Sequence, residues 1–181
     1  GGHRLIALLD TMQRLWGRRR RPETEVWERG DRTEKFWGAG NGRSSIDSAF
    51  DLNLTAEIAA AKKHHLVTVL LDMIKCYEMI KLPVLFQIFR EVNFPLRLGW
   101  MLIQSYIAPR RIDAFGSLSE PYVSFQGILA GCSAASSVMM AILLQPRKRT
   151  IGRFPGVQAR ALMDDVSLQW RGPDTGTWKW S

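Results

Sequence analysis

Two adjacent carboxylates, Asp164 and Asp165, lie between two short apolar stretches, residues 161–163 and 166–170. Aspartate is depleted in strand interiors, so the doublet predicts a tight turn between two strands, with negative charge concentrated at the turn. Carboxylate oxygens at such a turn are suitable ligands for a divalent cation. Aspartate is also an ordinary turn residue, so a plain surface turn is the alternative interpretation of the doublet alone.

A third carboxylate, Asp72, follows the apolar run 66–71, which predicts a short strand buried on both faces. A charge there is costly unless it lies at an edge, caps a helix or is paired with a cation. Capping of the helix-like sequence that follows is one interpretation. The other joins Asp72 to Asp164 in a two-metal site, where carboxylates from neighbouring strands hold two magnesium ions.

The elements that position these carboxylates begin with helices. Apolar periodicity predicts a helix over about residues 5–17 that ends near Gly17, followed by a polar connecting segment, residues 18–43. Ser44 and Ser45 offer an N-cap to a second helix. Its predicted buried stripe comprises Ile46, Ala49, Phe50, Leu54, Ile58 and Ala61.

Further elements follow the Asp72 strand. The sequence predicts helices over residues 83–92, 95–107 and 134–145, strands over 111–115 and 122–125 that pair with each other, and a glycine-containing loop over 127–133. The doublet hairpin comes last. This order predicts an α/β or α+β fold whose central sheet presents Asp72 and Asp164.

Composition limits the class of protein. The chain has 181 residues, of which 46% are hydrophobic, which predicts one globular domain. Residues near Gly1 do not resemble a natural start, and residues 172–181 lack apolar periodicity, so we expect a fragment. The two cysteines lack metal-ligand spacing and favour a reducing, intracellular compartment. The longest apolar run, residues 138–144, is too short to cross a bilayer, so we expect a soluble protein without a membrane partner.

The net charge of +8, with a pI near 10.0, favours a polyanionic partner, and nucleic acid is the leading candidate. The excess is clustered at residues 18–21, 110–111 and 147–149. A solvated basic face or a localisation signal is the alternative interpretation of each cluster.

Four segments resemble, in order and spacing, the motifs of reverse transcriptases from non-LTR retrotransposons and group II introns. Residues 69–78 are similar to the first catalytic motif, a hydrophobic strand followed by D-x-x-K-A-F-D/E, with Asp72, Lys75 and Tyr77 in register. Residues 162–165 resemble the Y-A-D-D motif.

The other two segments also follow the order of the family, one between these two motifs and one before them. Residues 127–133 resemble the motif G-V-x-Q-G-x-x-x-S-P. Residues 3–9, with residues 13–16 downstream, resemble the fingers segment R-P-I-x-L-L and a helix that carries an aromatic residue. The resemblance implies a polymerase palm, an antiparallel sheet packed on helices, with partial fingers. It places the fingers at about residues 1–65, the palm at about 66–171 and a disordered or truncated tail at 172–181.

The activity that this resemblance implies is RNA-directed DNA polymerisation, with an RNA template, a DNA primer and deoxynucleoside triphosphates as partners. Asp72 and Asp164 would hold two Mg²⁺ ions, with Mn²⁺ as an alternative, and Asp165 would support the pair. One ion would activate the primer 3′-hydroxyl and the other would bind the triphosphate.

The resemblance also implies substrate contacts. Arg4 and the main chain near Met73 and Ile74 would meet the incoming triphosphate, and Tyr77 would clash with a 2′-hydroxyl and so select deoxynucleotides. Two glycines, Gly127 and Gly131, would let the backbone approach template and nucleotide closely. Lys75 and the basic clusters would contact the primer and template backbone. Tyr77 as an ordinary core aromatic, and Arg4 as an exposed helix-start residue, are the alternative interpretations.

Three positions depart from the family pattern. Leu162 replaces the motif tyrosine, Ala130 stands where the family has glutamine, and Leu5 stands where the family has proline. Two function classes therefore stay open: a polymerase palm that retains the magnesium site, and a catalytically inactive remnant that acts at most as a basic nucleic-acid-binding domain.

Overall fold

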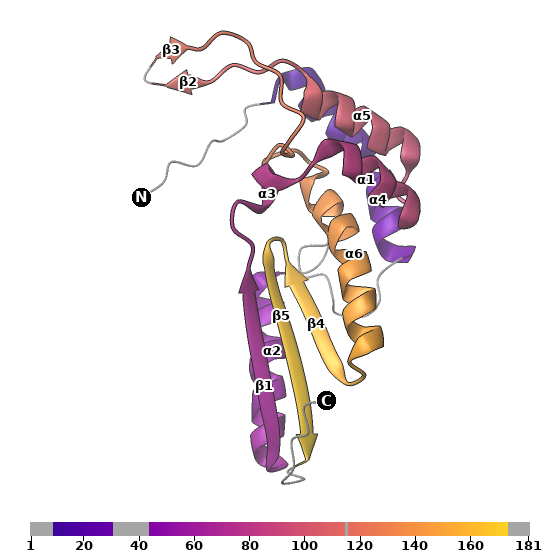
Figure 1. The fold of residues 1–181 in the computed structure, drawn as a ribbon, viewed down its shortest axis with the longest axis vertical. Coiled ribbons are helices and arrows are strands. Elements are labelled where there is room, and N and C mark those ends of the chain that lie inside the picture. The colour runs from indigo at the N-terminus through magenta and orange to yellow at the C-terminus, as the bar shows by residue number, and fades with distance from the viewer. Residues whose placement is uncertain (1–8, 31–43, 115, 174–181) are drawn as a thin grey trace. The chain divides into compact units, whose positions relative to one another are not determined.

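The computed structural model describes residues 9–30, 44–114 and 116–173. The chain divides into two compact units. The first comprises residues 1–30 and 74–142, and the second comprises residues 31–73 and 143–181. Figure 1 shows helices together with antiparallel strands. The fold is α+β, which confirms that predicted class.

In the first unit, helix α1, Thr11–Gly30, is longer than predicted. The expected end near Gly17, with a connecting segment after it, was wrong for residues 18–30. Gly17 lies inside the helix and is needed for packing, because a Cβ there would collide with the Ser133 side chain. The polar stretch beyond it is also helical, and ion pairs between residues three and four apart add to its stability. These pairs are Arg20–Glu23 at 2.6 Å and Arg21–Glu25 at 2.9 Å.

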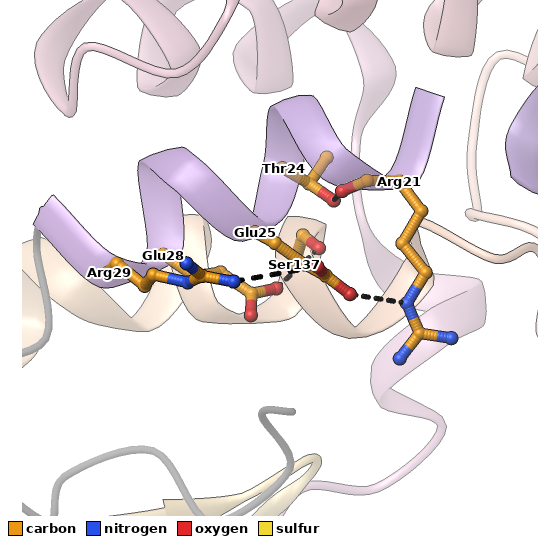
Figure 2. A network of polar contacts seen from close by, with 6 residues as sticks. All are labelled: Arg21, Thr24, Glu25, Glu28, Arg29 and Ser137. Atoms are coloured by element: carbon orange, nitrogen blue, oxygen red, sulfur yellow. Dashed lines mark hydrogen bonds and ion pairs between the residues drawn. The ribbon is translucent and has the colours of Figure 1, made fainter. Parts of the chain in front are cut away.

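A buried polar contact joins α1 to helix α6, Ala135–Arg153, as Figure 2 shows. The Ser137 hydroxyl donates a hydrogen bond of 2.6 Å to the Glu28 carboxylate, and both residues are buried. Glu25 instead pairs with Arg21 at the surface. Exposed ion pairs contribute about 0–1 kcal/mol. A buried hydrogen bond to a charged group contributes about 1.5–3 kcal/mol, so the Ser137 contact is the stronger link.

The core of the first unit lies around helices α4, Leu82–Glu91, and α5, Leu96–Ile107. Both helices confirm the sequence prediction. The Phe89 and Phe94 rings stack with their centroids 4.4 Å apart. Gly99 lets α5 approach closely, because a Cβ there would lie 2.6 Å from the Phe89 ring. The fully buried side chains of this unit include Leu82, Leu85, Phe89, Val92, Phe94, Leu102, Tyr106, Val138 and Met139.

A short hairpin follows α5. Strand β2, Asp113–Ala114, pairs with β3, Ser117–Leu118. The prediction that residues 122–125 form the partner strand was wrong; within the described residues, Tyr122 makes an isolated bridge to Arg110. The reason is local, because Gly116 adopts a φ of +79° and reverses the chain at once.

In the second unit, helix α2, Ser45–Ala61, begins at the predicted N-cap. The Ser44 hydroxyl accepts from the backbone N–H of Asp47 at 3.2 Å, and the Asp47 carboxylate accepts from the backbone N–H of Ser44 at 2.8 Å. The predicted buried stripe was wrong: Ile46 and Phe50 are 76% and 64% exposed. The buried residue of this helix is instead Ala59, near its carboxyl end.

Strands β1, His64–Asp72, β4, Val157–Leu162, and β5, Asp165–Pro173, form an antiparallel sheet in the order β1-β5-β4 within the described residues (Figure 1). The prediction of a β1 buried on both faces was wrong. Among the described residues it is an edge strand that pairs with β5 alone, and its residues from Val67 to Asp72 are exposed.

Helix α6 continues past its predicted end at residue 145, through Pro146, to Arg153. Within the described part of the chain, no helix combines the length and apolar character that crossing a bilayer requires. Gly172 belongs to β5, and residues 174–181 lie outside the described ranges. The division into fingers, palm and tail stays a prediction.

Candidate metal and nucleotide site

The hairpin of β4 and β5 carries the aspartate doublet at its turn, as predicted. Leu162 pairs with Asp165, so Met163 and Asp164 alone form the turn. Met163 adopts a φ of +60°. This left-handed conformation costs a residue with a Cβ roughly 1–2 kcal/mol. Such strain persists where the surrounding structure fixes it, and here the paired strands on both sides do so.

The pairing of β1 with β5 brings the third carboxylate to the doublet. Asp72 and Asp165 are partners in the antiparallel register. Directly opposed side chains share a face of the sheet, with Cβ atoms about 5 Å apart. Asp164 lies in the turn immediately beside them. The three predicted carboxylates therefore gather at one end of the sheet, with Asp165 rather than Asp164 directly opposite Asp72.

Two carboxylates of like charge lie opposite each other in this register. Like charges directly opposite one another destabilise a strand pair. Asp72 and Asp165 are exposed and Asp164 is half-buried, and among the described residues none of the three forms an ion pair or a side-chain hydrogen bond. A divalent cation would offset the repulsion, and carboxylate oxygens are the donors that magnesium prefers. The donor chemistry fits magnesium, although in the described ranges no three His, Cys, Asp or Glu residues already converge as a metal-binding group.

A buried polar network fixes the register of the sheet. Gln169, 3% exposed, donates to the Thr68 hydroxyl on β1 at 3.3 Å and to the Leu52 carbonyl on α2 at 3.5 Å. Arg160 on β4 donates to the Gln169 side-chain oxygen at 2.6 Å. A slip of one residue would turn the Asp72 side chain to the other face, so this network protects the carboxylate pair.

These supporting residues were missed by sequence reasoning. The available signal was the period of two: polar Ser167 and Gln169 alternate with apolar residues along the stretch that follows the doublet. Both polar side chains are buried. Alternation of this kind identifies a polar row on one face of a strand, but it does not identify the partners in that row.

In the first unit, the predicted nucleotide loop contacts the short helix α3, Cys76–Met79. The Ile128 N–H donates to the Tyr77 carbonyl at 2.8 Å. Gly127 is buried with a φ of +87°, and a Cβ there would lie 3.3 Å from the Glu78 backbone. The close backbone approach made by Gly127 is thus to α3 of the same chain. Its approach to template or nucleotide stays a prediction.

The remaining predicted contact residues have varied surroundings. Gly131 is exposed, with a φ of +96°. Met73 and Tyr77 are half-buried, whereas Ile74 is 83% exposed. Arg4 lies outside the described residues. The nucleotide-binding roles of all these residues stay predictions.

A buried phenol lies in the same unit as the loop. Burial raises the pKa of Tyr106 well above its ordinary value of 10.0, and the neighbouring Cys132 and then Tyr77 add to the effect. Tyr106 is therefore neutral at physiological pH and provides an uncharged contact for the loop that carries Cys132. In the sequence, the available signal for its burial is the helical spacing of Tyr106 from Leu102 and Ile103, which are also buried on α5.

Comparison with known proteins identifies the fold. No family model and no curated protein matches the chain. The structure is similar to that of telomerase from Candida tropicalis in complex with a TWJ fragment of telomeric RNA, with a TM-score of 0.61 and 12% identity over 91% of this chain. It is also similar to apo telomerase from the same organism, truncated from its C-terminal domain, with a TM-score of 0.57 and 14% identity over 86% of this chain. This chain covers 29% and 34% of those two chains, and the likeness shows a reverse transcriptase-like fold.

Proposed function

We propose that this chain is a reverse transcriptase domain of the non-LTR retrotransposon and group II intron type, which transfers deoxynucleotides to a primer 3′-hydroxyl on an RNA template. One observation carries the proposal. The antiparallel register sets Asp72 opposite Asp165, next to Asp164 in the turn. The fold similarity to telomerase supports a polymerase, and the four motif resemblances support the retroelement type.

In this proposal, Asp72 and Asp164 hold two Mg²⁺ or Mn²⁺ ions and Asp165 supports them. When bound, the ions supply Lewis-acid charge for the attacking and leaving oxygens. The contribution of the chain is to hold the carboxylates. Strand pairing fixes Asp72 against Asp165, and the strained conformation of Met163 fixes the direction in which Asp164 leaves the turn.

The nucleotide contacts belong to the same proposal. Main-chain groups at Met73 and Ile74, together with Arg4, meet the triphosphate. Tyr77 excludes a 2′-hydroxyl and so selects deoxynucleotides. Gly131 is the glycine whose exposure suits a close approach to the template, whereas buried Gly127 holds the loop against α3.

The nucleic-acid partner is supported by charge. The chain carries a net charge of +8, and Arg18 and Arg19 lie exposed on α1. One of the similar telomerase structures contains an RNA fragment. Contacts between arginines and phosphates release counterions, so we expect the affinity for a primer–template duplex to fall steeply with salt concentration.

Primer extension on an RNA template tests the activity. Extension with Mg²⁺ and deoxynucleotides is measured for the unchanged chain, for Asp164→Ala and for the matched control Asp113→Ala, an exposed aspartate on β2. We expect Asp164→Ala to lose about a hundredfold or more of the activity, the size of effect seen when a transition-state charge stabiliser is removed. Asp113→Ala should retain the activity. Equal activity of all three proteins would refute the catalytic assignment.

A second candidate is nucleic-acid binding without turnover. Leu162 favours it, because this residue pairs with Asp165 where the family motif has tyrosine. Fluorescence anisotropy with a labelled RNA–DNA duplex separates the two candidates. Salt-dependent binding without extension by any variant would support the binding domain. Mn²⁺ binding is measured separately by electron paramagnetic resonance. Loss of Mn²⁺ binding in Asp72→Asn would still support the metal site.

A further inference from the structure

The outer edge of β1 is an open strand surface in the described part of the second unit. Within these residues β1 pairs with β5 on one side and with no strand on the other, as Figure 1 shows. An edge of this kind presents unpaired N–H and C=O groups to any extended segment, and proteins usually protect it with lysine, proline or a bulge. The sequence of β1, HHLVTVLLD, contains neither lysine nor proline.

Apolar side chains accompany this free edge. Val67, Val69 and Leu71 are 46%, 43% and 47% exposed, and they share one face because alternate residues of a strand point the same way. Leu70, on the other face, is 73% exposed. The edge therefore offers both main-chain hydrogen bonds and apolar area to a partner strand.

The sequence of β1 is complementary to itself when it is read in the opposite direction. In an antiparallel pair centred on Thr68, Thr68 of one copy lies opposite Thr68 of the other. Val67 then lies opposite Val69, and Leu66 lies opposite Leu70. At both ends His64 lies opposite Asp72, which sets an imidazole N–H donor against a carboxylate. Every apolar residue from 66 to 70 thus meets an apolar residue, Leu71 meets His65, and the only carboxylate of the strand meets a hydrogen-bond donor.

We propose that a second copy of this chain pairs with β1, antiparallel and centred on Thr68, so that the two sheets become continuous across a two-fold axis. The symmetry of the strand sequence favours an identical partner, because the same surface serves both copies. Main-chain hydrogen bonds provide affinity, and the matched Val67 and Val69 side chains provide the register. This self-association goes beyond the proposed polymerase function and does not depend on it.

Sedimentation velocity of the full chain over a range of concentrations tests the dimer. We expect a reversible monomer–dimer equilibrium. Val69→Lys places a charge beside Val67 of the other copy twice per dimer, which should raise the dissociation constant about tenfold or more. The matched control is Leu118→Lys, which introduces the same charge at a 64% exposed position of β3 and should leave the dissociation constant unchanged.

Disulfide crosslinking tests the register independently. Thr68→Cys places the two new thiols opposite each other at the axis, so oxidation should yield a covalent dimer. In His64→Cys the two new thiols lie roughly 27 Å apart, at a rise of about 3.4 Å per residue, and should not crosslink. The unchanged chain gives the background from Cys76 and Cys132. A chain that is monomeric at all concentrations, equal weakening by both lysine variants, or crosslinking at residue 64 as efficient as at residue 68 would each overturn the proposal.

Discussion

The core around α4 and α5 in the first unit and the sheet of the second unit bury different kinds of side chain. The first unit buries large aromatic and aliphatic residues, and Phe89, Phe94 and Tyr106 are at most 1% exposed. The sheet of the second unit instead buries small or polar residues. These are Ala159, Ala161, Ser167 and Gln169. Among the described residues, the large buried hydrophobic side chains thus lie mainly in the unit that does not carry the three carboxylates, with Leu143 and Leu144 as exceptions.

This difference indicates how the proposed metal site is maintained. Burial of a large apolar side chain contributes about 1.5–3 kcal/mol, so the first unit has the larger reserve of stability. The sheet that bears Asp72 depends on strand pairing and on the Gln169 hydrogen bonds for its register. Functional regions are commonly drawn from the less stable part of a protein. Changes in each unit should therefore have effects of different size.

The largest effect is expected for Phe89→Ala in the core of the first unit. Loss of this buried ring should lower the free energy of unfolding by about 3–5 kcal/mol, because it removes apolar contacts and leaves a cavity. Urea denaturation measures the change, and hydrogen exchange shows whether α4 and α5 open before the β4–β5 amides. The control Phe125→Ala removes a ring that is 66% exposed and should change stability by less than about 0.5 kcal/mol. Similar losses for both variants would show that the burial of Phe89 does not account for the stability of the first unit.

A smaller effect is expected for Ser137→Ala, which removes the donor to buried Glu28. A buried acceptor left without its partner costs about 1–3 kcal/mol, measured by the same denaturation. Combining Ser137→Ala with Glu28→Leu removes both partners and should restore much of the loss. Equal stability of Ser137→Ala and the unchanged protein would show that the contact in Figure 2 does not stabilise the unit.

In the second unit, Ser44→Ala should lower stability by about 1 kcal/mol, because it removes the hydroxyl that caps α2. Circular dichroism and thermal unfolding measure the loss. Ser45→Ala, at an exposed position one residue further along, should change stability by less than about 0.5 kcal/mol. A larger loss at Ser45 than at Ser44 would contradict the assignment of the cap.

The smallest effect at neutral pH is expected for Tyr106→Phe, and it should grow in alkali. Burial raises the pKa of Tyr106 in the folded chain above the ordinary value of 10.0. Above that pH the unfolded chain loses the phenol proton while the folded chain keeps it, so the stability present below pH 10.0 is lost as the pH rises further. The difference between the urea midpoints at about pH 8 and about pH 11 should be smaller in Tyr106→Phe than in the unchanged protein. An unchanged pH dependence in the variant would show that Tyr106 does not contribute.

Local signals explain what the sequence predicts correctly. Apolar periodicity predicts α4 and α5, a serine cap predicts the start of α2, and the flanking apolar stretches predict the hairpin at Asp164. Each of these signals lies within a few residues of the feature that it predicts. The meeting of Asp72 with the doublet is one of two interpretations of Asp72 from the residues, and the motif resemblance favours it.

Contacts between distant segments explain the errors. Gly17 predicts the end of a helix, but it lies inside α1, where the absence of a side chain allows close packing against Ser133. The apolar run of β1 predicts burial on both faces, but burial depends on the neighbours of the strand, and β1 has one neighbouring strand in the described residues. The partners of Gln169 likewise come from α2, β1 and β4, so its role depends on the assembled sheet.

The strand register has a consequence for the order in which the chain folds. The hairpin of β4 and β5 joins segments adjacent in the sequence, whereas β1 is separated from β5 by every helix from α3 to α6. Closing so long a loop costs chain entropy before its contacts form, so local pairings are expected to precede it. The doublet should thus be in place in its turn before Asp72 arrives. An incompletely folded chain can therefore present Asp164 and Asp165 as expected and still lack the third carboxylate.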